Sequence, residues 1–180
     1  MPADSPGMRV VAAPGLTLEP QTAAHAEEMF AVLADPAIYE YENEPPPSLE
    51  WLRTRFTKLE SRRSPDGGEA WLNWVIRLPT GALVGYVQAT VQADGCASIA
   101  YELSSAYWGR GLATRAAEAM IGELRERYRV RDVFAVFKRS NHRSMRLLER
   151  LGFKPASPAQ HAERHVEPGE LLMHRDLGKP

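Results

Sequence analysis

Cysteine is almost absent from this sequence of 180 residues, which contains only Cys96. A single thiol excludes an internal disulfide and offers no cluster of sulfur ligands for zinc or an iron–sulfur centre. The five histidines are scattered along the chain, so we expect no metal site. Such sparse use of cysteine is typical of a reducing compartment, and we expect a cytoplasmic protein.

Long apolar runs and an excess of one charge are also missing. The opening MPADSPGMRVVAAPG has no apolar core of the kind found in secretion signals, and no later run approaches the roughly 20 apolar residues that span a bilayer. The formal net charge of -1 excludes the overall basicity of a nucleic-acid coat protein. We therefore expect a soluble, intracellular chain without a membrane or nucleic-acid partner, in which any anion binding is local.

The sequence does contain enough apolar material for one core. With 44% hydrophobic and 25% charged residues, its length fits one domain better than two. We expect a single domain over residues 1–180 with a flexible start over residues 1–14. No internal repeat or low-complexity segment interrupts it.

Residue periodicity predicts helices and strands in alternation. The expected helices cover residues 22–34, 49–59, 112–128 and 141–151, with Ser48 and Asn141 as N-caps and Gly152 at the end of the last. The expected strands cover residues 15–20, 70–78, 82–91, 96–103, 132–137 and 169–177, with a further one opening at Phe153 and a loop over residues 155–169.

The connections between these elements indicate the fold class. Short, turn-rich links join the three strands over residues 70–103, which favours an antiparallel meander. A crossover helix joins strand 96–103 to strand 132–137, which favours a parallel pair. We therefore expect an α/β (α+β) fold with a single mixed, mostly antiparallel sheet of about six to seven strands and helices on both faces.

A glycine-rich loop, AYWGRGLAT, separates a strand from a helix. The first turn of a helix leaves about four N–H groups unpaired and attracts anions. Gly109, Gly111 and Ala113 leave room for a ligand beside that backbone, and Arg110 and Arg115 supply positive charge. An ordinary turn is the alternative. The loop matches neither the Walker phosphate loop nor the dinucleotide fingerprint.

Two segments together carry a family resemblance. YELSSAYWGRGLATRAAEAM and NHRSMRLLERLGF resemble the two core segments of the GNAT superfamily of acyl-CoA-dependent N-acyltransferases. The form of the loop is similar to the branch that includes the ribosomal-protein N-terminal acetyltransferases. Trp108 stands where the family usually has Gln or Arg, and Gly111 and Ala113 match its two small positions.

The resemblance implies a GNAT fold and a set of groups that bind acetyl-CoA, the co-substrate, without a metal. A backbone donor for the thioester carbonyl is implied near Leu103 or Ser104. Asn141 is implied at the diphosphate or pantetheine and Arg143 at the ribose phosphate; helix capping and a solvated surface are the respective alternatives. The diphosphate is implied to bind the loop, which consists of Trp108, Gly109, Arg110, Gly111, Leu112, Ala113 and Thr114.

Two side chains are candidates for the chemistry. Glu102 lies on the opposite face of its strand from Tyr101 and Leu103, and a carboxylate on a covered face is either paired or used. If used, it is the base that takes the ammonium proton. Ser144 is the candidate donor to the leaving thiolate, although a serine there also suits the first helical turn. The tyrosine that relatives carry on this helix is absent.

The expected reaction is direct transfer of an acetyl group from acetyl-CoA to a primary amine. At pH 7 an α-amine is about 14% neutral and a lysine about 0.04%, so a weak base favours an α-amine, such as a protein N-terminus. The acidic, aromatic stretch 38–48 is implied at the acceptor cleft. An acetyl-CoA-binding sensor or scaffold without transferase activity is the alternative, and the chain is expected to be a monomer or homodimer.

Overall fold

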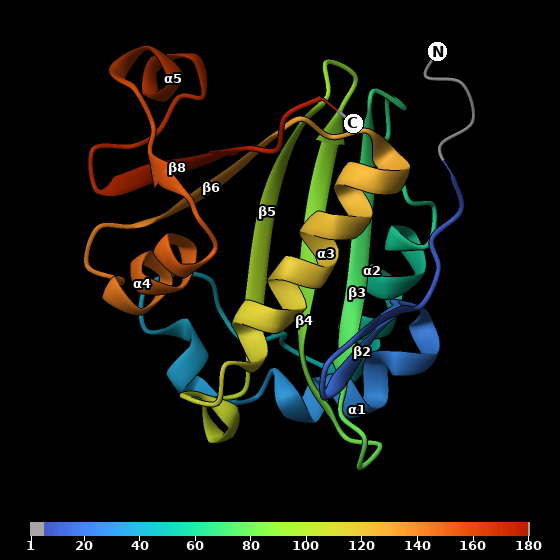
Figure 1. The fold of residues 1–180 in the computed structure, drawn as a ribbon. Helices are drawn as coiled ribbons and strands as arrows, with labels where there is room; N and C mark the ends of the chain where they lie inside the picture. The colour runs from blue at the N-terminus through green and yellow to red at the C-terminus, as the bar shows by residue number, and fades with distance from the viewer. Residues whose placement is uncertain (1–5, 180) are drawn as a thin grey trace.

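The computed structural model describes residues 6–179 as one mixed sheet with helices on both faces (Figure 1). The strands are β1 Val11–Ala13, β2 Leu16–Pro20, β3 Glu69–Arg77, β4 Leu83–Gln92, β5 Cys96–Leu103, β6 Asp132–Lys138, β7 Lys154–Pro155 and β8 Glu170–Asp176. The helices are α1 Ala26–Val32, α2 Leu49–Leu59, α3 Leu112–Tyr128, α4 His142–Arg150 and α5 Pro158–Glu163.

The order of strands across the sheet is β1-β2-β3-β4-β5-β6-β8-β7. All neighbours are antiparallel except β5 and β6, which run parallel. That parallel pairing covers only three residue pairs, from Cys96 with Asp132 to Ser98 with Phe134. Both strands continue beyond it, so the sheet opens into a gap at the carboxyl ends of β5 and β6.

Alternation along the strands places two apolar cores on the two faces of the sheet. Leu72, Trp74 and Ile76 of β3 belong to the core that α3 and α4 cover, whereas Val75 belongs to the core under α1 and α2. Figure 1 shows α3 crossing one face with α2 behind the sheet. The two faces of the sheet at the gap are therefore called the α3 side and the α2 side.

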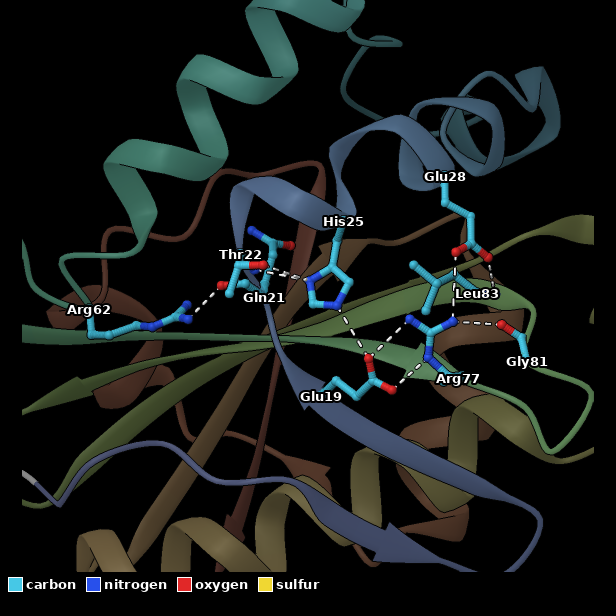
Figure 2. Close-up of polar contacts among 9 residues, drawn as sticks. All are labelled: Glu19, Gln21, Thr22, His25, Glu28, Arg62, Arg77, Gly81 and Leu83. Carbon is cyan, nitrogen blue, oxygen red and sulfur yellow. Dashed lines mark hydrogen bonds and ion pairs between the residues drawn. The ribbon is translucent and has the colours of Figure 1, made fainter.

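A polar network ties α1 to the sheet (Figure 2). Arg77 of β3 makes a bidentate ion pair with Glu19 of β2. His25 contacts the same carboxylate at 3.2 Å, and Glu28 of α1 accepts from the Leu83 N–H at 2.8 Å. Because these contacts span β2, β3, β4 and α1, they fix the start of the chain segment that leads to α2.

The antiparallel meander, the parallel crossover and the caps at Ser48 and Asn141 are confirmed. The sheet has eight strands rather than six to seven, because the short edge strand β1 adds to those expected. β1 lies within the stretch expected to be flexible, where Arg9 also pairs with buried Glu123 at 2.7 Å. The expectation for residues 1–5 lies outside the described residues.

The loop expected over residues 155–169 instead contains α5. Ser157 accepts from the Gln160 N–H at 3.2 Å while the Gln160 side chain accepts from the Ser157 N–H at 2.9 Å, and Pro158 occupies the first turn. This capping box stabilises a short helix start. The strand expected to open at Phe153 begins one residue later, since Phe153 is buried in the core.

Over residues 6–179 no helix combines the length and the apolar character needed to cross a bilayer. The same part of the chain holds no group of three or more His, Cys, Asp or Glu placed to bind a metal ion.

Candidate active site

The gap between β5 and β6 holds a cavity of about 120 Å³. Its walls come from the end of β5, the end of β6 and the first turns of α4. Tyr101 of β5 and Ser144 of α4 meet there, with 2.7 Å between their hydroxyl oxygens. Burial raises the pKa of Tyr101 to about 12, so this phenol stays protonated. Sequence reasoning found Ser144 but missed Tyr101, because nothing local pairs positions 43 residues apart.

The glycine loop opens α3 directly beside this cavity. Gly109 and Gly111 have φ values of 75° and 73°, the left-handed region that favours glycine. Gly111 is the N-cap of α3 and supplies no side-chain acceptor. Within residues 6–179, no protein acceptor bonds the backbone N–H groups from Gly109 to Thr114. A row of unpaired donors at a helix start is a binding site for an anion.

The space above the loop is also open. A Cβ added at Gly109 or Gly111 would meet nothing within 4 Å. Arg110 lies over the ring of Tyr107, 5.3 Å from its centroid, and Arg115 donates to carbonyl oxygens of the loop. The second arginine therefore buttresses the loop. Unpaired donors, an open approach and no nearby carboxylate in the loop fit the diphosphate of a coenzyme A group.

Trp108 connects the loop to the cavity. Its indole N–H donates to the Leu103 carbonyl oxygen at 2.9 Å, and the Arg143 guanidinium stacks on its ring, 3.5 Å from the centroid. The structure thus brings Trp108, Arg143 and the cavity together. Asn141 caps α4 by accepting from the Ser144 N–H at 3.1 Å. The Ser104 N–H donates to the Val84 carbonyl oxygen at 2.8 Å, so that amide is already occupied.

Glu102 is held on the α2 side of β5. Its carboxylate forms no ion pair within the described part of the chain. Burial raises the pKa of its carboxyl from 4.5 to about 7; the Leu103 N–H and the Arg143 charge oppose this rise, and the carboxylates of Glu42 and Asp35 add to it. A group titrating near neutrality can both accept and release a proton. The sequence left two alternatives for Glu102, a structural ion pair or a role as a base, and the ion pair is wrong.

A close approach of β4 fixes the backbone of Glu102. Gly85 of β4 lies opposite Leu103, and a Cβ at Gly85 would collide with the Glu102 carbonyl oxygen. Any larger residue at this position would push β5 away. Asp35 holds the segment that follows β5, since its carboxylate accepts from the Ser105 N–H at 2.7 Å and from the Ala37 N–H at 3.0 Å.

A second cavity, of about 310 Å³, lies on the α2 side of the sheet. Glu102 lines both this chamber and the cavity in the gap. Of the acidic, aromatic stretch implied at the acceptor cleft, Tyr41 and Glu42 line the first cavity and Tyr39 and Glu44 line the second. Both cavities are thus lined by Glu102, a carboxylate whose pKa is near neutrality.

Comparison with known proteins identifies the family and the fold. A family model described as an acetyltransferase (GNAT) domain matches residues 15–154. Among similar solved structures is RimL, a ribosomal L7/L12 alpha-N-protein acetyltransferase in complex with coenzyme A. It has a TM-score of 0.78 and 16% identity over 93% of this chain and 98% of that chain.

Two further structures have the same overall fold. The ribosomal-protein-S5-alanine acetyltransferase from Vibrio fischeri has a TM-score of 0.76 and 14% identity over 94% of this chain and 97% of that one. Mycobacterium smegmatis RimJ in complex with CoA-disulfide has a TM-score of 0.75 and 21% identity over 94% and 86% of the two chains. At these identities the likeness establishes the fold, and the family model establishes the family.

Proposed function

Given that the chain belongs to the GNAT acetyltransferase family and is an acetyl-CoA-dependent acyltransferase, we propose that it acetylates a primary amine, with a protein or peptide N-terminal α-amine as the acceptor. The proposal assigns the α3 side of the gap to acetyl-CoA and the α2 side to the amine. Glu102 lies between them as the base, and Ser144 as the hydrogen-bond donor to sulfur.

One observation carries the proposal. The Glu102 carboxyl is largely buried, forms no ion pair, and lines both the cavity in the gap and the chamber on the α2 side. A buried carboxyl without a partner destabilises the fold when it ionises, so structure alone gives no reason for it. A base for an amine that enters from the α2 side accounts for its position.

The residues of the chain supply each proton movement. Glu102 takes the proton of the ammonium group, and the neutral nitrogen attacks the carbonyl carbon of the thioester. A C–N bond forms, the C–S bond breaks, and the second proton of the nitrogen is transferred to the departing sulfur. Glu102 then releases its proton to solvent. The Ser144 hydroxyl, held by Tyr101, donates a hydrogen bond to the departing sulfur, which ends as the thiol.

The raised pKa of Glu102 supports an α-amine as the acceptor. A base with a pKa of about 7 is well matched to an α-ammonium group of pKa about 7.8, whereas proton transfer from a lysine at about 10.4 is unfavourable by more than three pH units. RimL, which has the same fold, is an alpha-N-protein acetyltransferase, and this supports the same acceptor class.

Release of coenzyme A thiol from acetyl-CoA, followed with a thiol reagent, tests the proposal. Each peptide of a panel is compared with its N-terminally blocked form, and a blocked peptide with one lysine measures ε-amine transfer. We expect thiol release only with a free N-terminus. Equal or faster release with the lysine peptide would refute the α-amine assignment, and binding of acetyl-CoA without release by any amine would indicate a sensor.

A further inference from the structure

The chamber on the α2 side has a polar floor that no protein group satisfies. Gln21 and Asn73 are only 4% and 6% exposed, and both line the chamber. Neither side-chain amide bonds another protein group within residues 6–179. Both amides nevertheless reach the open space of the chamber, because the one fully buried polar side-chain atom without a partner in this part of the chain is Arg62 Nη1. Gln88 and Tyr86 of β4 face the same space. Amides that line a cavity and bond no protein group can donate to and accept from a ligand.

These side chains form a row across the sheet that steps by two residues along β4, from Gln88 to Tyr86. Asn73 of β3 lies opposite Gln88 of β4, and Tyr86 of β4 lies opposite Glu102 of β5. Gln21 follows β2 directly and its N–H donates to the Asn73 carbonyl oxygen at 2.9 Å. The Arg62 guanidinium donates to the Gln21 carbonyl oxygen, which holds the backbone at this end of the row (Figure 2).

The length of the row matches an extended ligand. Three strand spacings of about 4.8 Å separate β5 from β2, so the row extends about 14 Å from the Glu102 end. An extended peptide advances about 3.3 Å per residue. An amine at Glu102 therefore leaves room for the body of its molecule to lie across β4 and β3 beneath α2.

The chemistry of the floor restricts that body. A side-chain amide offers two N–H donors and one carbonyl acceptor, which complement amide and hydroxyl groups. An alkyl chain would leave the amides unpaired at a cost of about 1–3 kcal/mol each. A polyamine would bring further cations to a chamber whose charged lining is Glu102 inside and exposed Glu44 and Arg55 outside. The floor thus suits an uncharged, hydrogen-bonding body.

We propose that Gln21 and Asn73 form the acceptor-specificity subsite, which binds uncharged amide or hydroxyl groups attached to the reacting amine. The inference rests on the proposed function, because it takes Glu102 as the point where the amine reacts. A short peptide and an amino sugar share this chemistry. An aliphatic amine and a polyamine do not.

The test measures kcat/KM for four amines in wild type and variants: a neutral tripeptide amide, glucosamine, hexylamine and spermidine. Asn73→Leu removes one amide at similar volume, and Gln21→Met removes the other. Each is expected to lower kcat/KM for the hydrogen-bonding acceptor about 10- to 100-fold and to leave hexylamine unchanged or improved. If only the tripeptide amide loses kcat/KM, the subsite binds peptide groups. If only glucosamine does, it binds sugar hydroxyls.

Gln92→Met is the matched control, because Gln92 lies at the far end of β4 beside a separate cavity. It should change none of the four rates. Calorimetry of acetyl-CoA binding shows whether each variant is folded, and Gln21→Met decides the question if Asn73→Leu is not. An equal loss with all four amines, or spermidine as the best wild-type acceptor, would overturn this inference alone. Failure of every amine would count against the proposed function instead.

Discussion

Replacing Glu102 with Gln should make the protein more stable at pH 8 while making it a worse enzyme. The pKa of this carboxyl rises from 4.5 to about 7 on folding, chiefly through burial. The folded state therefore holds a proton that the unfolded state has lost between pH 4.5 and 7. Stability falls as pH increases through this window and stays low above it. Gln keeps the shape of the protonated form and carries no such penalty.

The magnitude follows from the size of the pKa change. A rise of about 2.5 at about 1.4 kcal/mol per unit gives roughly 3 kcal/mol, and the partial exposure of the carboxyl reduces this to about 2–3 kcal/mol. For a chain of this length each kcal/mol corresponds to about 2–4 °C in Tm. We expect the variant to melt on the order of 5–10 °C higher than wild type at pH 8, with no difference near pH 4.

The rate profile gives an independent readout of the same group. In wild type, kcat/KM for an α-amine acceptor should rise about tenfold per pH unit and level off near pH 7, because the ionised Glu102 carboxylate takes the proton of the ammonium form. In the variant it should keep rising to about pH 7.8, since only the neutral amine reacts. Glu50→Gln, at an exposed carboxylate of α2 that lines neither cavity, is the control. Identical rate profiles together with identical pH dependence of Tm would refute the reasoning.

Three other substitutions test separate parts of the site. Gly111→Asp should weaken acetyl-CoA binding at least tenfold in calorimetry, whereas Gly67→Asp, with the same φ of 73° and equally open space, should bind normally; equal affinities would remove the anion site. Tyr101→Phe should lower kcat about 3- to 10-fold with little change in KM, because its serine partner loses its orientation, and an unchanged kcat would contradict this role. Gly85→Ala should cost about 1–3 kcal/mol in urea unfolding and reduce kcat, while Gly122→Ala, with open space around it, should not destabilise; a silent Gly85→Ala would show that β4 and β5 need no close approach.

Local patterns were sufficient to predict most of the fold. Ser48 and Asn141 cap their helices as expected, because an N-cap is a matter of one side chain and the next three residues. Alternation along β5 correctly placed Tyr101 and Glu102 on opposite faces. The loop Gly109–Thr114 is recognisable from its small residues, because this pattern too is local in the sequence.

Contacts between distant segments were not predictable in this way. The hydroxyl pair of Tyr101 and Ser144 depends on how α4 packs beside β5. That no other protein group bonds the amides of Gln21 and Asn73 becomes visible only when all their neighbours are known. β1 is stabilised by pairing with β2 and has no strong pattern of its own. The capping box of α5, by contrast, is a local signal in the sequence. It was missed because the surrounding stretch is short and rich in proline, which favours a loop.

The opening of the sheet at β5 and β6 has a consequence for how such a chain can diversify. Under the proposed function, consecutive residues of one strand serve two different molecules, with Tyr101 on the thioester side and Glu102 on the amine side. Substitutions at positions such as Asn73 and Gln88 would then change which amine is accepted while the groups for the acyl donor stay intact. A new acceptor preference needs only alternate positions on the strands to change.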